Sequence, residues 1–147
     1  MAGKIIFFLC IFFLISDSGP ASGWKKLLIH DRHLIRVEYA TTSREQIQGL
    51  GGRKNFPDGT GMLFIYKSPG ERIFWMKRMR IPIDILWIHR GQIVSIEHQV
   101  PPPSTLMQDN YLKRYGHGIA ADMVLELPAG YVRRHSIQVG HSIQLIP

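Results

Sequence analysis

One short segment of the chain combines an aromatic and a cationic side chain at a spacing that suits a binding site. Trp75 and Lys77 are two residues apart, so on a strand they would face the same side. An aromatic wall beside a cation suits a sugar ring or an anionic group. In the alternative interpretation, which we prefer, Trp75 fills the core while Lys77 reaches water or pairs with an acid.

Three further charged residues are candidates for binding or catalysis. Arg53 lies in a Gly-rich loop, where a guanidinium can hold a carboxylate or phosphate, although a structural clamp on Asp84 or Glu126 is favoured. Glu126 stands between two leucines and would serve as a general acid or base if burial raised its pKa. An outward-facing edge charge or a buried ion pair is the preferred interpretation of Glu126.

Asp84 is the single charged residue of an apolar segment, residues 83–88, that predicts a strand covered on both faces. A buried carboxylate needs a nearby cation or backbone donors. Lys77 and Arg53 are the expected cations. The candidate ligand-binding set is therefore Arg53, Trp75, Lys77, Asp84 and Glu126, and no catalytic set is assigned.

The seven histidines do not predict a metal centre. His30 and His33 are three apart, which places them on opposite faces of one strand, and no His-x-His or HExxH spacing occurs. His89 and His98 would face each other across a predicted hairpin. The sequence contains no nucleophile elbow, P-loop or dinucleotide fingerprint. We therefore expect no metal and no cofactor.

The first 23 residues have the pattern of a secretory signal peptide. A short positive start precedes an apolar run, Ile5–Ile15, and a small, polar segment that ends at Gly23. The run is shorter than the ~20 residues of a spanning helix, and an uncleaved anchor is the alternative. Cys10, the single cysteine, lies inside it. We predict an exported protein, periplasmic or extracellular, whose residues 24–147 form a single domain without disulfides.

The composition describes a basic globular protein. The chain has 147 residues, 45% of them hydrophobic, and a net charge of +7. Such a charge favours acidic partners. Because we predict that the protein is exported, we expect phospholipid heads or wall polymers rather than nucleic acid. The predicted partner is an envelope ligand, either small or polymeric, and an anionic ligand is one of the alternatives. Peripheral contact with the membrane is a further alternative. The oligomeric state is left open.

The periodicity along residues 24–147 is mostly that of strands. Thr42 and Glu45 have capping-box spacing, which predicts a short helix over Ser43–Leu50 that the Gly51-Gly52 pair ends. A second helical turn is expected near Tyr131–His135. Short strands with at most two short helices indicate an all-β fold, an antiparallel β-sandwich or a partly closed barrel. The predicted strands are Leu27–His30, Leu34–Ala40, Met62–Tyr66, Arg72–Met79, Ile83–His89, Gln92–Gln99, Met123–Leu127 and Ser142–Ile146.

The stretch Pro101–Ala121 has no clear periodicity and is long for a connection without secondary structure. We expect a functional flap, a mobile loop or a tolerated insertion. In a flap, Tyr111 and Tyr115 would be the contact residues.

Several blocks of sequence occur in an order that resembles one family. They are Gly49-Leu50, Arg53, Gly61-Met62-Leu63-Phe64, Phe74-Trp75-Met76-Lys77, Ile81-Pro82-Ile83-Asp84-Ile85, Val124-Leu125-Glu126-Leu127-Pro128-Ala129-Gly130 and Gly140. Their order and spacing over Ile35–Ile146 resemble domain of unknown function 192. The resemblance implies a small β-sandwich or barrel-like domain, often exported, and no established activity. The sequence departs from the family pattern at Gly51, Arg78-Met79 and His141, where the family usually has Met, Asn-Thr and Asp.

The residues thus support two hypotheses of different class. The first is a non-catalytic envelope domain that binds a ligand near Trp75, Lys77 and Arg53. The second is an envelope hydrolase that uses Glu126 or Asp84, although no pair of carboxylates at glycosidase separation is selected by the sequence. A structural accessory protein is a third option.

Overall fold

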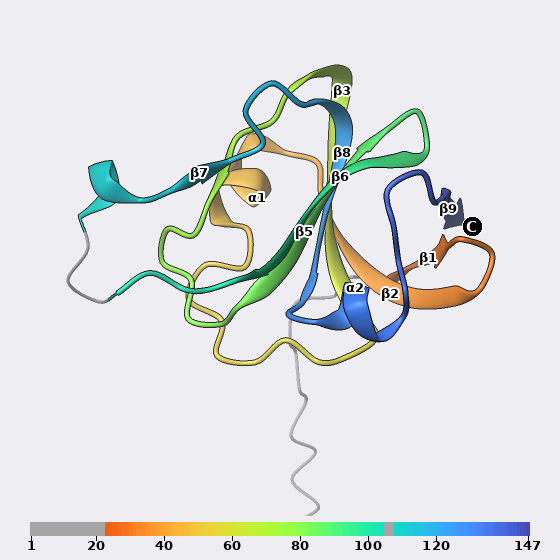
Figure 1. The fold of residues 1–147 in the computed structure, drawn as a ribbon, viewed down its shortest axis with the longest axis horizontal. Coiled ribbons are helices and arrows are strands. Elements are labelled where there is room, and N and C mark those ends of the chain that lie inside the picture. The colour runs from red at the N-terminus through yellow and green to blue at the C-terminus, as the bar shows by residue number, and fades with distance from the viewer. Residues whose placement is uncertain (1–22, 105–107) are drawn as a thin grey trace, which may run out of the picture.

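The computed structural model describes residues 23–104 and 108–147, and one strongly curled sheet dominates it (Figure 1). The predicted signal peptide therefore lies, except for Gly23, outside the described residues. The sheet has the order β6-β5-β8-β3-β2-β1-β9, and a two-stranded ribbon of β4 (Phe74–Trp75) and β7 (Arg114–Tyr115) lies beside it. The strands of the sheet are β1 (Lys25–Ile29), β2 (His33–Ala40), β3 (Thr60–Glu71), β5 (Ile83–His89), β6 (Gln92–Val100), β8 (Ala120–Pro128) and β9 (Ile143–Ile146).

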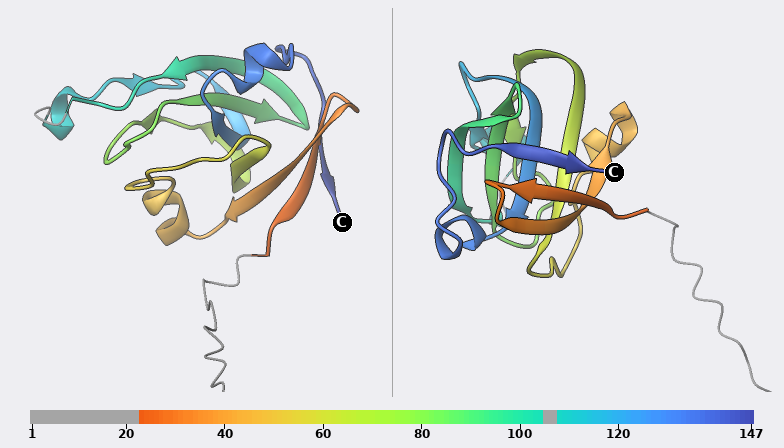
Figure 2. Two further views of the ribbon diagram at one scale, coloured as in Figure 1. Left: turned by 90° about the horizontal axis from the view of Figure 1, so that it is seen from below. Right: turned by 90° about the vertical axis from the view of Figure 1, so that its right-hand side faces the viewer.

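The sheet curls into a half-barrel, which Figure 2 shows from two directions. Its two edge strands meet at one end only. There the Ile93 amide donates to the His141 carbonyl at 3.0 Å, and the Ile143 amide donates to the Gly91 carbonyl at 2.8 Å. The predicted all-β class and partly closed barrel are thus confirmed.

One strand pair differs from the expected antiparallel pattern. β2 and β3 run parallel, with Ala40 beside Phe64, because α1 (Ser43–Gln48) and a loop carry the chain back between them. The helix begins with the predicted capping box, in which the Glu45 side chain accepts from the Thr42 amide at 2.9 Å. It ends at Gln48 rather than Leu50, because Gly49 takes a positive φ of 46°.

Each face of the sheet carries its own core, because side chains alternate along every strand. The concave face packs against α2 (Tyr131–Arg134) and includes Leu86, Leu125 and Leu127. The other face packs under α1 and the ribbon and includes Phe64, Ile85 and Trp87. Both faces of β5 are buried, as its apolar sequence predicts.

The segment Arg72–Met79 was predicted as one strand, and this prediction is wrong. Only Phe74–Trp75 forms a strand, β4, which pairs with β7 (Arg114–Tyr115). Residues after Met76 turn, with the Met79 amide donating to the Met76 carbonyl at 3.1 Å and Arg78 at a φ of 60°. Met79 is therefore buried, whereas Lys77 is exposed.

The segment Pro101–Ala121, expected to lack structure, contains a short 3₁₀ helix, η1 (Asp109–Tyr111), and β7. The two tyrosines named as contacts differ. Tyr111 is exposed, as expected of a contact residue, whereas Tyr115 is buried in the core under β4. Residues 105–107 of this segment are not among the described residues. In the described part of the chain no helix has the length and apolar character needed to cross a membrane.

Candidate functional site

A cavity of about 450 Å³ lies between α1, the outer face of the sheet and the β4 turn. We call it the α1 pocket. Four aromatic side chains contribute to its wall, and a carboxyl group comes from the sheet. The lining residues used below are Gln46, Gln48, Phe64, Tyr66, Phe74, Trp75, Lys77, Arg78 and Glu126.

The α1 wall of the pocket is held by one amide side chain. The register of β3 against β8 shifts between Ile65 and Gly70, so β3 leaves its regular ladder there. The Gln46 side-chain amide donates to the Ile65 carbonyl at 3.0 Å and to the Ala40 carbonyl at 3.3 Å. These bonds fasten the helix to both parallel strands and set the distance between helix and sheet.

Glu126 is the carboxyl group of the pocket. It pairs with Met62 on β3 and Ile85 on β5, which places it on the face that carries Phe64. Its side chain belongs to a residue only 6% exposed, and its Oε2 has no hydrogen-bond partner among the described residues. Burial raises the pKa of Glu126 to about 8, against the opposing charge of Arg53. The preferred sequence interpretations, an edge charge or a buried ion pair, are both wrong.

Arg53 lies behind this carboxyl group but is bonded elsewhere. Its two terminal nitrogens donate to the two oxygens of Glu38 at 2.7 and 2.6 Å. The predicted structural clamp is therefore present, with Glu38 as its acid in place of Asp84 or Glu126. Arg53 lines a neighbouring cavity between β2 and α1 together with Glu38, and it acts on Glu126 only through its charge.

The rim of the pocket is aromatic and cationic. Trp75 is 39% exposed, so it does not fill the core as the preferred interpretation stated. The Lys77 ammonium lies 5.1 Å from its ring centroid and the Arg114 guanidinium 5.0 Å. Lys77 also forms an ion pair with Asp109 at 2.6 Å, so the expected pairing with an acid is observed.

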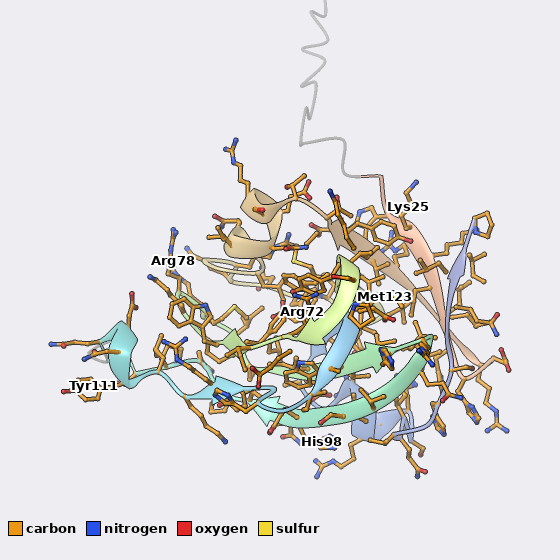
Figure 3. All side chains as sticks on the ribbon, turned by 90° about the horizontal axis from the view of Figure 1, so that it is seen from above. Lys25, Arg72, Arg78, His98, Tyr111 and Met123 are labelled. Carbon is orange, nitrogen blue, oxygen red and sulfur yellow. The ribbon has the colours of Figure 1, made fainter. Side chains whose placement is uncertain are left out.

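Arg78 completes the rim from a turn that the loop after α1 supports. The Gly52 amide donates to the Arg78 carbonyl at 2.8 Å. Its φ of 60° is uncommon for an arginine and costs backbone energy. Figure 3 shows its side chain projecting outward on the side of the molecule that carries Tyr111. This is the position where the resemblance has Asn, a residue that tolerates that region better.

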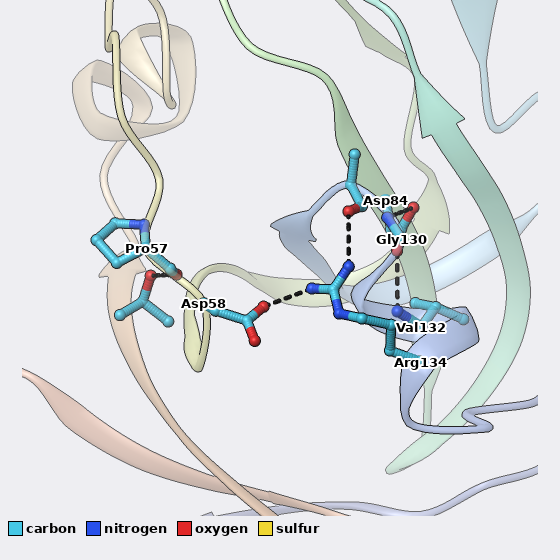
Figure 4. Close-up of polar contacts among 8 residues, drawn as sticks. Pro57, Asp58, Asp84, Gly130, Val132 and Arg134 are labelled. Atoms are coloured by element: carbon cyan, nitrogen blue, oxygen red, sulfur yellow. Dashed lines mark hydrogen bonds and ion pairs between the residues drawn. The ribbon is translucent and has the colours of Figure 1, made fainter.

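Asp84 does not belong to the pocket. It pairs with Leu127 and so faces the other core, on the opposite side of the sheet from Glu126. Its oxygens accept from the backbone amide of Gln99 at 2.7 Å and from those of Gly130 at 3.1 Å and Val132 at 2.9 Å, and Figure 4 shows the last two contacts. Backbone donors are thus its partners, and the expected cations Lys77 and Arg53 are not, because both pair with other acids.

Of the residues predicted from the sequence, Trp75, Lys77 and Glu126 line the α1 pocket together, whereas most of its lining residues were not predicted. Phe64 and Tyr66 are two residues apart on β3 and so face the same side of the sheet. This spacing indicates a pocket wall only when that side is known to border a cavity. Gln46 and Arg78 gave no signal, because a register shift and a turn place them. The five predicted residues are consequently distributed over three environments: the pocket, the Glu38 clamp and the core around Asp84.

Four of the seven histidines form two ring contacts with each other. His30 and His141 stack with ring centroids 3.7 Å apart, and His33 meets His135 edge to face. No group of three or more potential ligand side chains in the described ranges is placed to hold a metal ion. The predicted contact of His89 with His98 is wrong, because the hairpin register pairs His89 with Gln92.

The fold and the pocket define a small, mostly β domain with one buried acid beneath an aromatic and cationic rim. The chain belongs to the family DUF192, uncharacterised conserved proteins, whose profile matches residues 26–145. This membership confirms the resemblance seen in the sequence.

Two solved structures are similar to the chain over most of its length. One, from Sinorhizobium meliloti, is described as a proposed transcription regulator; it has a TM-score of 0.74 at 26% identity and covers 84% of this chain and 95% of its own. The other, a protein of unknown function from Novosphingobium aromaticivorans, has a TM-score of 0.75 at 26% identity and covers 86% and 89%. Among curated proteins, none matches this chain.

Proposed function

We propose that this protein is an exported envelope domain that binds an oxygen-rich, anionic ligand in the α1 pocket. One observation carries the proposal: Glu126 is buried in the pocket wall with an oxygen that no group of the described protein satisfies. An unsatisfied buried polar atom costs about 1–3 kcal/mol, so a fold retains it where the group has a use.

The rim supports a negatively charged ligand. Lys77 and Arg78 line the pocket, Arg114 lies against Trp75, and the chain as a whole carries +7. Basic side chains beside an exposed ring attract and orient an anion that can stack. Arg78 has an unfavourable positive φ, and a strained backbone that presents a cation at this turn is consistent with a role in binding an anion.

Binding is better supported than hydrolysis. Hydrolysis of a glycosidic bond ordinarily uses two carboxyl groups that face one reacting centre. Glu126 is the only acid among the residues that line the α1 pocket, and Asp84 faces the opposite side of the sheet with three backbone donors on its oxygens. The alternative of an envelope hydrolase therefore lacks its second group.

Export is part of the proposal and rests on the N-terminal sequence. Residues 1–23 have the arrangement of a signal peptide, and the cysteine-free remainder suits an oxidising compartment. N-terminal sequencing of the protein isolated from its own envelope fraction should find Trp24 as the first residue. An intact Met1 on protein recovered from the cytoplasm would contradict this localisation.

Native mass spectrometry of protein purified from its own envelope tests the binding. We expect an additional bound mass on the wild type that is lost in Trp75→Ala, which removes an exposed rim side chain. Tyr111→Ala is the matched control, since it removes an aromatic side chain that is 73% exposed and outside the pocket. A bound mass that survives Trp75→Ala, or its absence from the wild type, would reject the α1 pocket as the site.

A further inference from the structure

The two oxygens of Glu126 meet an environment that contains no counter-ion. The carboxyl group lies between Met62 and Ile85 on the neighbouring strands, with the aromatic rings of the α1 pocket in front. No ion pair to Glu126 occurs among the described residues. A buried carboxylate with neither a cation nor a hydrogen-bond donor is far less stable than the neutral acid.

The charged groups around Glu126 do not change this conclusion. Arg53, the nearest cation to influence it, has its terminal nitrogens bonded to Glu38. From β3, Tyr66 faces the pocket, and burial raises its pKa to about 12, so it stays neutral in the same range. From the β4 turn, Lys77 and Arg78 lie at the rim and are exposed. The α1 side presents the uncharged amides of Gln46 and Gln48.

We infer that Glu126 contacts its ligand as an uncharged carboxylic acid, whose hydroxyl donates a hydrogen bond to a ligand oxygen, and that the ligand is an acidic sugar. This inference rests on the proposed function and names its ligand class. The protonated acid supplies one donor and one acceptor, which matches a sugar hydroxyl group. The side-chain nitrogens of Gln46 and Gln48 are bonded to backbone carbonyls, so these residues offer their side-chain oxygens as acceptors, and Trp75 offers a face for the ring.

The ligand charge belongs at the rim rather than beside Glu126. A sugar carboxylate at the rim is attracted by Arg78, beside the Lys77 that already pairs with Asp109, while the uncharged ring lies deeper in the pocket. An amino sugar is disfavoured twice, because the rim repels its ammonium and the neutral acid offers it no counter-charge. Glu126 and the rim thus select for carboxylate-bearing sugars and against cationic ones.

Binding should be linked to one proton. Above about pH 8, the pKa of Glu126, the carboxyl group ionises, loses its donor and repels an anion. The affinity for an acidic sugar should then fall by up to about tenfold for each further pH unit. Glutamine at this position keeps a neutral donor at every pH, so it should remove this dependence while retaining binding.

Glucuronate, glucose and glucosamine are the matched probes, because they share one ring and differ in charge. We would titrate each into the wild-type chain and follow amide shifts of pocket residues by NMR. At pH 6, where glucosamine is cationic, glucuronate should bind most tightly and glucosamine most weakly. Between pH 7 and 9 the wild type should lose affinity for glucuronate, whereas Glu126→Gln should not. Asp58→Asn, the same change in an exposed acid outside the pocket, should behave as the wild type.

Three results would overturn the inference. If glucosamine binds best and Glu126→Gln loses it, Glu126 acts as an ionised counter-ion. If wild type and Glu126→Gln share one pH profile, the carboxyl group does not take part. If none of the three probes shifts pocket residues at millimolar concentration, the sugar class is wrong. A bound mass that is present on the wild type and lost in Trp75→Ala would in each case still identify the α1 pocket as the binding site.

Discussion

Asp84 and Glu126 are both buried acids on adjacent strands, yet the protein treats them in opposite ways. Asp84 is fully buried and accepts three backbone hydrogen bonds, two of them from Gly130 and Val132 at the start of α2. Glu126, on the other face, has an oxygen with no partner in the described structure and neighbours a cavity. The Asp84 carboxylate stabilises the fold through these bonds, whereas Glu126 keeps an oxygen that a ligand of the proposed site could bind.

The difference follows from which groups the chain brings to each face. Gly130, the residue before α2, has no side chain to cap that helix, so the carboxylate of a neighbouring strand does so. Among the described residues no helix N-terminus donates to Glu126, and the side-chain amides of Gln46 and Gln48 on α1 donate to backbone carbonyls instead. Burial alone therefore does not distinguish the acid that caps a helix from the acid of the proposed site, whereas the hydrogen-bond donors around each of them do.

The largest expected effect is on Asp84. Asp84→Ala should lower the free energy of unfolding by ~3–5 kcal/mol, because three backbone amides, two of them in buried contacts, lose their acceptor. Urea unfolding measures it. Adding Lys77→Met should not recover this loss, since Lys77 pairs with Asp109. Recovery in the double variant would mean that Lys77 is the counter-ion of Asp84 after all.

Glu126→Gln, in contrast, should raise the free energy of unfolding. The folded protein keeps the Glu126 proton up to about pH 8, whereas an ordinary glutamate ionises near 4.5. Because the folded state binds more protons in this window, wild-type stability should fall as pH rises from 4.5 to 8. The neutral amide removes this dependence and should add ~1–2 kcal/mol at pH 7. Parallel stability profiles of variant and wild type would show that Glu126 is ionised in the folded protein.

Arg78→Asn should give a smaller gain in stability and a loss of binding. Asparagine tolerates the positive φ of this turn better than arginine, by roughly 0.5–1 kcal/mol. Thermal unfolding should show a slightly higher midpoint, together with weaker binding of an anionic probe. Arg80→Asn is the control, as Arg80 is an exposed neighbour without a positive φ. Equal effects of both variants would remove the argument that strain at Arg78 serves the site.

The smallest effect is electrostatic and concerns Arg53. Arg53→Met should raise the pKa of Glu126 further, because the guanidinium is the group that holds it down. Carbon-13 NMR of the Glu126 carboxyl group measures this shift. Arg134→Met, which removes an arginine paired with Asp58 away from the pocket, should leave that pKa unchanged. An unchanged pKa in Arg53→Met would separate the Glu38 clamp from the site altogether.

The amino-acid sequence by itself determined the class of fold and much of the core. Strand periodicity located both faces of β5, and the Thr42–Glu45 spacing located α1, because these features depend on neighbouring residues alone. The resemblance in the sequence blocks identified the family. Glu126 and Trp75 could be selected as candidates, since a carboxyl group between leucines and a Trp-x-Lys pair are visible without a structure.

The partners of those residues were decided by the tertiary structure. Asp84 finds Val132, 48 residues away, and Arg53 finds Glu38 on a strand that only the parallel β2–β3 pairing brings near. The turn at Arg78 interrupts a strand pattern because the Gly52 amide and the β7 partner stabilise a different path. Periodicity predicts which side of the sheet a residue faces. The donors and charges that it meets there depend on contacts between segments distant in the sequence. Glu126 faces a cavity instead of a donor from a distant segment, and for this reason it is the centre of the proposed site.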